Sequence, residues 1–232
     1  MISRRALKAI STMPIEVGPF RQSTTGAIVP FFNDSRRVYG HPEVFAVFVE
    51  ELAKRIRAHR RRGHRIDGIV GIPMAGIPLG AAIAQRLKLP FGYLNTKRKK
   101  TLTKKLLEGE FRSDARVALV DDVIGLGGTI QHAICDCKRE GVAVTFVVTM
   151  WNPWPRQNAN FLKRLRRRGI FYDTLYTRFD WISYLASHGI ASQDMVDIQK
   201  AFLANVTGWQ TDPKMWKKFL TWKRRWRATG KM

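Results

Sequence analysis

Hydrophobic positions recur along the chain with two different spacings, and the longer spacing is clearest in residues 42–62. Val44, Phe48, Leu52 and Ile56 follow one another at intervals of four residues, between a proline at the start of the segment and a glycine after its end. Apolar residues at this interval share one face of a helix, so the pattern predicts a helix over this segment.

Short apolar runs bounded by glycine or polar residues predict strands, and amphipathic segments between them predict helices. Such an alternation is typical of an α/β fold, in which a mostly parallel sheet carries helices on both faces. The predicted strands are residues 66–72, 91–94, 117–120, 142–150 and 170–176, and the further predicted helices are residues 76–87, 129–140, 156–168 and 179–187.

The two ends of the chain depart from this alternation. Residues 191–232 are rich in tryptophan and basic residues, and they predict two helices, at about 192–204 and 213–227. We therefore expect three regions: a basic N-terminal segment over 1–19, an α/β domain over 20–190, and a helical, basic C-terminal extension over the remainder.

The strongest chemical signal lies where the strand predicted at 117–120 ends. Asp121 and Asp122 follow this strand, and a glycine-rich segment then leads to a helix that begins near Thr129. Ligands of open parallel sheets bind beyond the carboxyl ends of the strands. Glycines allow backbone N–H groups to approach a phosphate closely, and a helix N-terminus adds positive potential. The predicted phosphate loop is Val123, Ile124, Gly125, Leu126, Gly127, Gly128 and Thr129.

These features predict a sugar-phosphate site, with carboxylates for sugar hydroxyls and amides for a phosphate. The alternative is a tight turn whose aspartates only cap a helix. The segment is not a Walker A loop, because Gly-Lys-Ser/Thr is missing, and it is not a dinucleotide fingerprint, because its acids precede the glycines.

This segment resembles the phosphate loop of type I phosphoribosyltransferases, most closely that of orotate phosphoribosyltransferases. The resemblance extends over about residues 20–190 and implies the type I phosphoribosyltransferase fold. It implies transfer of a phosphoribosyl group from 5-phosphoribosyl-1-pyrophosphate (PRPP) to a pyrimidine base, orotate being the first expectation, with Mg²⁺ held mainly by PRPP. Further similar segments are residues 25–33, 71–79, 98–99 with 107–109, and 179–185.

The resemblance also implies roles for individual residues. Asp121 and Asp122 would contact the ribose hydroxyls and the water molecules on Mg²⁺. Phe31, Phe32 and Arg156 are the candidates for base binding. The implied pyrophosphate loop is Ile72, Pro73, Met74, Ala75 and Gly76.

A catalytic loop is implied within the polar, basic stretch 97–110, which shows no strand pattern and is expected to be mobile. Arg98 and Lys99 would grip the pyrophosphate from a neighbouring subunit, which implies a homodimer, and Lys100 and Lys104 are the nearest further cations. A solvated charge run is the alternative for this stretch.

The chain departs from the family pattern at several positions. Thr24 stands where a lysine is frequent, Leu102 stands where the catalytic loop usually has a second lysine, and no histidine occurs in that loop. The usual Asp-Arg, whose arginine holds the orotate carboxylate, is replaced by Trp151-Asn152, with Arg156 nearby in sequence. The PRPP half of the site is thus nearly intact, whereas base recognition and the catalytic loop are altered.

The net charge of +23, from 41 basic and 18 acidic residues, exceeds what one phosphorylated substrate requires. A field of this sign attracts polyanions. An alternative function is therefore a catalytically weak or inactive member of the fold that binds RNA or a ribonucleoprotein through its basic surface. RNA or DNA is accordingly a candidate partner of the basic patches. The intact aspartate pair favours an enzyme. Acid-free basic runs occupy residues 54–65, 156–168 and 214–231.

Met215, Phe219, Trp222 and Trp226 form one stripe of the last predicted helix. Such a basic amphipathic helix can pack on its own domain, dock a partner, bind nucleic acid or lie on a membrane.

Two further features concern the compartment. No apolar run approaches the roughly 18 residues of a membrane-spanning helix, and Cys135 and Cys137, two positions apart, are expected to be free thiols in a reducing, cytoplasmic setting. The first fifteen residues hold three basic residues and no acid, so an organellar transit peptide is the alternative to a disordered or surface-packed start.

Overall fold

The computed structural model describes residues 2–22, 26–95 and 105–229. The catalytic-loop candidates Arg98, Lys99, Lys100 and Lys104 lie outside these residues. The chain divides into two compact units, each built from two stretches. We call residues 1–9 and 35–178 the sheet unit, and residues 10–34 and 179–232 the hairpin unit.

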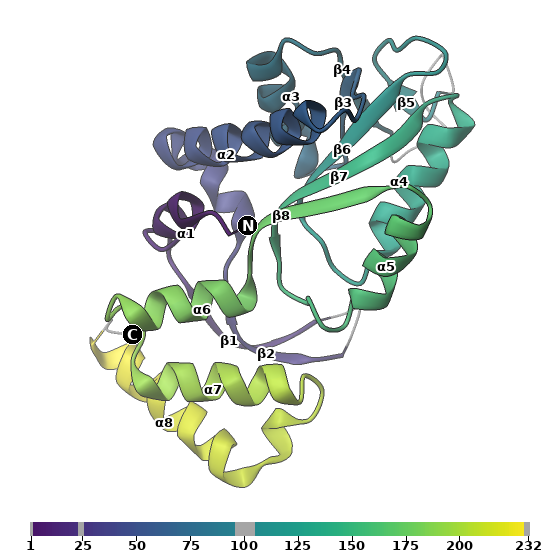
Figure 1. Ribbon diagram of the computed structural model, residues 1–232. Coiled ribbons are helices and arrows are strands. Elements are labelled where there is room, and N and C mark those ends of the chain that lie inside the picture. The colour runs from purple at the N-terminus through teal and green to yellow at the C-terminus, as the bar shows by residue number, and fades with distance from the viewer. Residues whose placement is uncertain (1, 23–25, 96–104, 230–232) are drawn as a thin grey trace. The chain divides into compact units, whose positions relative to one another are not determined.

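The sheet unit is built on six strands in the order β5-β4-β3-β6-β7-β8 (Figure 1). Neighbouring strands from β4 to β8 are parallel, and the two-residue β5 pairs antiparallel with β4. This confirms the predicted mostly parallel sheet. The bounds are β3 Gly68–Gly71, β4 Phe91–Leu94, β5 Leu107–Glu108, β6 Arg116–Val123, β7 Ala143–Asn152 and β8 Phe171–Thr177.

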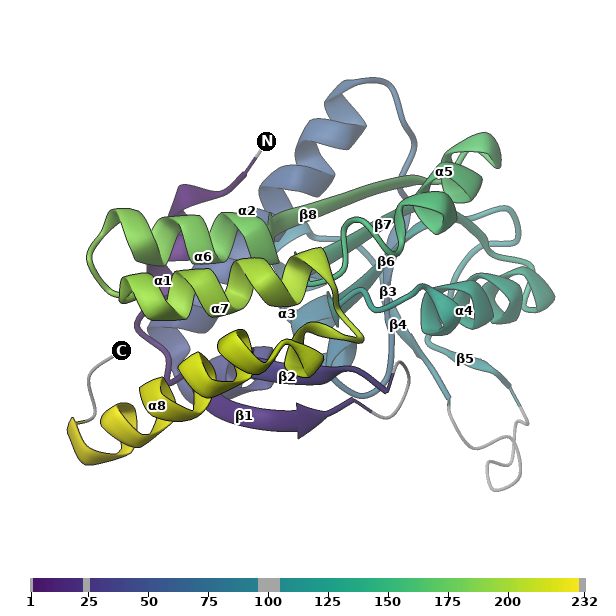
Figure 2. The same cartoon turned by 90° about the horizontal axis from the view of Figure 1, so that it is seen from below.

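Helices cover both faces of this sheet, as predicted. The helices α2 (Pro42–Arg61) and α3 (Gly76–Leu87) lie on one face, and α4 (Gly128–Arg139) and α5 (Ala159–Arg167) lie on the other (Figure 2). The apolar stripe of α2 faces inward, because Phe48, Leu52 and Ile56 are fully buried. The central strands β3 and β6 are buried along almost their whole length, as expected for a sheet covered on both faces.

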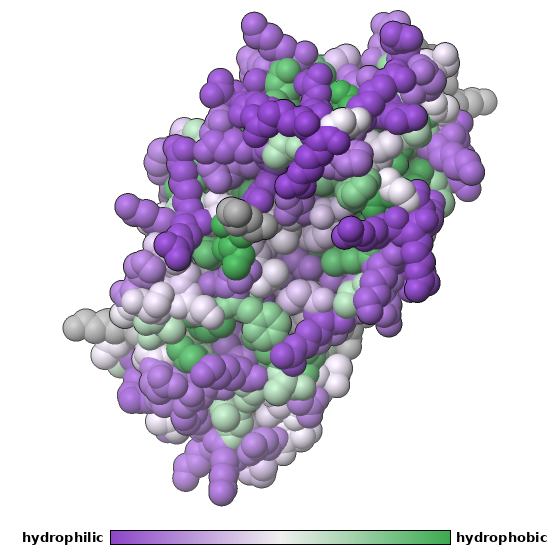
Figure 3. Space-filling view, viewed as in Figure 1, coloured by the Kyte–Doolittle hydropathy of each residue, from purple (hydrophilic) through white to green (hydrophobic). Residues whose placement is uncertain are grey.

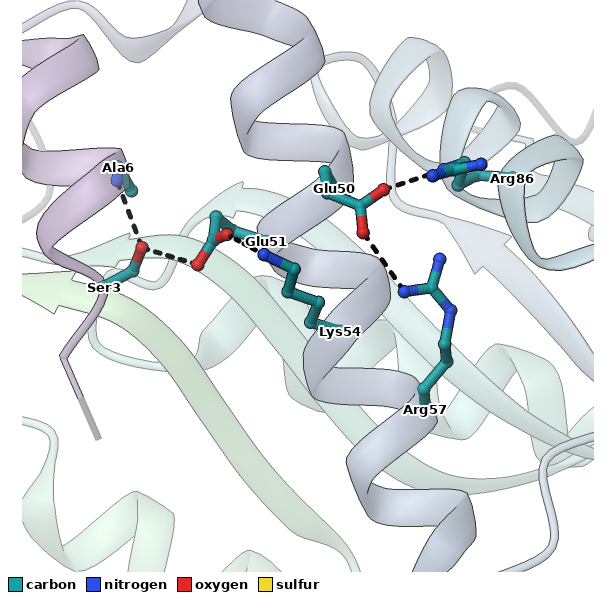
Figure 4. A network of polar contacts seen from close by, with 7 residues as sticks. All are labelled: Ser3, Ala6, Glu50, Glu51, Lys54, Arg57 and Arg86. Carbon is teal, nitrogen blue, oxygen red and sulfur yellow. Dashed lines mark hydrogen bonds and ion pairs between the residues drawn. The ribbon is translucent and has the colours of Figure 1, made fainter.

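The N-terminal segment belongs to the folded structure. A short helix, α1 (Arg4–Ile10), was not predicted, and its Ala6 and Leu7 are buried. The Ser3 hydroxyl donates a hydrogen bond to Glu51 on α2 at 2.8 Å and accepts one from the Ala6 N–H at 3.1 Å (Figure 4). The start of the chain is therefore packed rather than disordered, whereas its role in targeting stays a prediction. No helix in the described ranges combines the length and apolar character that a membrane crossing needs.

The hairpin unit combines a β-hairpin with the C-terminal helices. Strands β1 (Glu16–Arg21) and β2 (Ile28–Phe32) pair antiparallel. The helical part of the unit comprises α6 (Arg178–Ser187, whose first residue belongs to the sheet unit), α7 (Gln193–Ala204), the 3₁₀ helix η2 (Trp209–Thr211) and α8 (Pro213–Thr229).

An aromatic core holds the hairpin to α8. The Phe31 ring lies edge-on to Trp222 at 4.9 Å and to Phe219 at 6.2 Å, and the Trp209 indole N–H donates a hydrogen bond to the Ile28 carbonyl at 2.6 Å. The apolar stripe of α8 thus packs within its own unit. Of the roles considered for this helix, this is packing on its own domain. The C-terminal helices share a unit with the hairpin, so this division differs from the predicted regions, which separated 20–190 from 191–232.

Candidate active site

The predicted pyrophosphate loop and the aspartate pair meet at the carboxyl edge of the sheet. They follow or end the adjacent strands β3 and β6, and the Ile72 N–H donates a hydrogen bond to the Val120 carbonyl at 3.0 Å. A Cβ atom on Gly76 would lie 2.2 Å from that same carbonyl oxygen. Only glycine therefore permits α3 to begin this close to β6. Met74 is the most exposed residue of the loop.

Asp121 and Asp122 lie within β6 rather than after it, and each is 7% exposed. The Asp122 N–H donates a hydrogen bond to Asp121 Oδ1 at 2.9 Å, and the Ser35 hydroxyl donates one to Asp122 Oδ2 at 2.7 Å. Burial, together with the charge of Asp122, raises the pKa of Asp121 well above its ordinary range. Two carboxylates held this close favour a ligand that brings hydroxyl donors or positive charge.

The phosphate loop joins the end of β6 to the start of α4. Gly127 has a φ of +103°, and a Cβ atom there would lie 2.3 Å from the Phe161 ring, so this position requires glycine. Gly125, Gly128 and Thr129 are exposed. The loop therefore presents accessible backbone at a helix N-terminus, the arrangement that binds phosphate.

Asn158, just before α5, holds the phosphate loop through a side-chain hydrogen bond. This residue was not identified from the sequence. Its side-chain amide donates hydrogen bonds to the Gly125 carbonyl and to Asn152 Oδ1, both at 2.9 Å. Asn152 Oδ1 also accepts from the Trp154 N–H at 3.0 Å. Asn152 stands where the family has the arginine that binds orotate. Its uncharged side chain takes part in this buried hydrogen-bond network.

A short 3₁₀ helix, η1 (Ser35–Gly40), touches both halves of the site. Ser35 bonds to Asp122, and the hydroxyl of Tyr39 donates a hydrogen bond to the carbonyl of Ala75 in the pyrophosphate loop. Sequence reasoning missed both residues, because nothing in their local spacing indicates distant partners.

The predicted base-binding residues are not brought together within one unit. Arg156 is exposed in the turn after β7, in the sheet unit, whereas Phe31 and Phe32 belong to the hairpin unit. Phe31 is fully buried in the aromatic core of that unit, which disfavours a direct base contact, whereas Phe32 is 37% exposed. Their role in base binding stays a prediction.

Arg178, a further cation, directly follows the last residue of β8. The guanidinium carbon of Arg178 lies 5.3 Å from the Trp151 ring centre and 5.4 Å from that of Trp154. Burial lowers the pKa of Arg178 to about 10, so the side chain remains charged at neutral pH. Arg178 follows Thr177, which pairs with Asn152 across the β7–β8 ladder. The sequence signal that could have found it is an arginine directly after a predicted strand.

Fold and site together define a PRPP-type transferase: a parallel sheet with an aspartate pair, a phosphate loop and a pyrophosphate loop at one edge. Residues 38–164 match the phosphoribosyl transferase domain family. The chain belongs to the type I phosphoribosyltransferase family and is a phosphoribosyltransferase enzyme.

Curated and solved relatives agree with this assignment. The chain is 30% identical over 204 residues to an orotate phosphoribosyltransferase of Lactococcus lactis, covering 88% of this chain and 93% of that protein. Its fold is similar to Leishmania donovani UMP synthase, with a TM-score of 0.72 and 23% identity, covering 86% of this chain but only 41% of that one. It is also similar to orotate phosphoribosyltransferase from Aeropyrum pernix, with a TM-score of 0.63 and 22% identity, covering 78% and 99% of the two chains.

Proposed function

We propose that this enzyme transfers the phosphoribosyl group of PRPP to orotate, giving orotidine 5′-phosphate and pyrophosphate. The observation that carries the proposal is the juxtaposition of the aspartate pair with the pyrophosphate loop on adjacent strands. The name of the Lactococcus lactis relative supports orotate as the base. A cytoplasmic location, as for a pyrimidine-synthesis enzyme, is part of the same proposal.

Each part of PRPP has a chemically matched counterpart. Asp122, oriented by Ser35, and Asp121 would accept hydrogen bonds from the ribose hydroxyls. Backbone amides between Gly125 and Thr129 would hold the 5-phosphate, and those of residues 72–76 would hold the pyrophosphate. During transfer the bond from ribose C1 to the pyrophosphate oxygen breaks and that oxygen keeps the electron pair. The base nitrogen loses its proton to solvent and bonds to C1.

Mg²⁺ fits this site as an ion that arrives with PRPP. The two aspartates offer the hard oxygen ligands that Mg²⁺ prefers, directly or through water. Within the described ranges, no group of three or more His, Cys, Asp or Glu side chains is placed to hold a metal alone. The ion would neutralise charge on the departing pyrophosphate.

For the orotate carboxylate we propose Arg178 as a second candidate beside Arg156. Arg178 is desolvated and lies over two indole rings, where a charge-assisted pair is stronger than in water. Arg156 is exposed.

A homodimer, with Arg98 and Lys99 acting across subunits, belongs to the same proposal. The mass of the protein in solution, measured by light scattering, tests the dimer.

Pyrophosphate release tests the activity directly. Purified protein with PRPP and Mg²⁺ is given orotate, uracil, adenine or hypoxanthine in parallel, and release with orotate is expected to be fastest. Asp122→Asn provides the matched control, because it keeps the size of the side chain and removes its charge. Thermal stabilisation by PRPP and Mg²⁺ should largely vanish in this variant. Faster turnover with another base would refute orotate, and unchanged stabilisation of Asp122→Asn would refute the PRPP site.

A further inference from the structure

Exposed arginines gather at the amino edge of the sheet, opposite the edge that carries the PRPP loops. Helix α2 ends at Arg61, before β3, and α5 ends at Arg167, before β8. Because these strands are parallel, both helix ends come to the edge where strands begin. We call the six exposed residues Arg60, Arg61, Arg62, Arg166, Arg167 and Arg168 the amino-edge arginine cluster.

Aromatic packing fixes the end of α2 at the start of strands β7 and β8, the strand into which α5 leads. His59 stacks on Phe146 at 4.3 Å and meets Phe171 at 4.9 Å, and His64 lies 4.5 Å from Phe171. Phe171 opens β8 only three residues after Arg168, and it pairs with Phe146 in register. Both arginine triplets therefore lie at the start of the β7–β8 pair.

Among the described residues, the cluster has no carboxylate partner at ion-pair distance. Within the described part of the chain, none of its six members is in an ion pair, and Arg168 donates only to the neutral Gln131 side chain. Nearby carboxylates are already engaged, since Asp67 and Asp114 pair with Arg65 and Asp173 pairs with Arg55. The dipole of a helix favours a cation near its C-terminus. Three consecutive arginines at each of the two helix ends also repel one another, so the helix dipole does not account for their number.

We propose that the amino-edge arginine cluster binds the phosphate backbone of nucleic acid. Guanidinium groups match phosphate geometry with paired hydrogen bonds, and every member of the cluster is arginine. A lipid surface would also require exposed apolar side chains, and none of the large hydrophobic residues exposed in the described ranges lies on these helix ends. The surface over α5 is accordingly strongly hydrophilic (Figure 3).

Salt-dependent binding tests the cluster in the full-length protein. Labelled single-stranded RNA and duplex DNA, each of about 20 units, are titrated by fluorescence anisotropy from about 50 to 200 mM salt. Arg60→Gln, Arg61→Gln and Arg62→Gln are combined in one variant. Loss of three phosphate contacts should lower the log–log salt slope by about 2 to 3, with at least a tenfold loss of affinity at the lower salt. The probe that binds tighter shows which of the two nucleic acids the cluster prefers.

A charge-matched variant keeps the test specific. Lys217→Gln, Arg224→Gln and Arg227→Gln remove three exposed cations from α8, in the other unit. The slope should change by less than about 1 in this variant. An equal loss in both variants, no binding by the wild type, or preference for phosphatidylserine vesicles over both nucleic acids would overturn the proposal. Orotate turnover, at the opposite edge, should be unchanged in the cluster variant, so the outcome is independent of the proposed reaction.

Discussion

The Ser35 hydroxyl donates a hydrogen bond to Asp122 Oδ2 at 2.7 Å, across 87 positions of sequence. Both residues are buried, and the bond orients one carboxylate of the pair that we assign to the ribose. We therefore propose Ser35 as a positioning residue for the PRPP site, because its hydroxyl holds the Asp122 carboxylate in place.

Removal of this hydroxyl should weaken PRPP binding selectively. A hydrogen bond to a charged group contributes about 1.5–3 kcal/mol, so Ser35→Ala should raise the KM for PRPP by roughly 10- to 100-fold. Steady-state kinetics with each substrate varied in turn would measure this, and the KM for the base should change much less. Ser35→Thr keeps a hydroxyl and should restore most of the affinity. A KM for PRPP like that of the wild type in Ser35→Ala would contradict the assignment.

Asp121→Asn should stabilise the protein while it impairs PRPP binding. Burial and the charge of Asp122 raise the pKa of Asp121 above its value of about 3.9 in an unfolded chain. The folded state therefore binds the proton more tightly, and stability is lost as pH rises from about 4 through the folded-state pKa. Thermal unfolding with EDTA and no ligand should show a higher Tm for the variant at pH 7 and a smaller difference near pH 4. A lower Tm at pH 7 would show that the ionised pair is not a source of strain.

Gly127→Ala should damage the phosphate loop. A side chain at a φ of +103° costs about 1–3 kcal/mol, and the new methyl group would meet the Phe161 ring. Tm should fall, and inorganic phosphate should protect the variant less than the wild type. Gly125→Ala is the control for stability, because a Cβ there meets nothing within 4 Å. Equal Tm values for the two variants would argue against this packing.

His59 should make the sheet unit sensitive to acid. Burial lowers the pKa of His59 to about 4, whereas an unfolded histidine titrates near 6.5. Since the unfolded chain takes up the proton first, stability present above about pH 6.5 is lost as pH falls towards 4. Urea unfolding at several pH values should show this loss, and His59→Phe should reduce it. His132→Gln, an exposed change on α4, should leave the pH profile as it is. A profile unchanged by His59→Phe would rule out this residue as the cause.

The sequence predicted those helices and strands whose apolar residues follow a regular spacing. The four-residue interval from Val44 to Ile56 predicted α2, and the apolar run before Asp121 predicted β6 and the position of the site. Strand β1 escaped prediction, because its Gly18-Pro19 pair is typical of a turn, and β5 has only two residues.

Tertiary contacts account for what sequence reasoning could not reach in the site. Ser35, Tyr39 and Asn158 act through partners that lie 87, 36 and 33 positions away, so no local spacing encodes them. The resemblance to a family located the loops, but it named only residues that the family's motifs contain. Asn158 holds a carbonyl of the loop from outside those motifs.

Substitution of Arg178 should separate base recognition from PRPP binding. If its guanidinium meets the orotate carboxylate, Arg178→Lys should keep the charge but lose the paired hydrogen bonds. The KM for orotate should then rise by roughly 10- to 100-fold, with little change in the KM for PRPP. Arg156→Gln is the matched comparison, because Arg156 is exposed after β7 and stands closest in sequence to the replaced arginine. A rise confined to Arg156→Gln would transfer the role to Arg156. Equal rises in both KM values for Arg178→Lys, with a lower Tm, would instead show that Arg178 only supports the packing of Trp151 and Trp154.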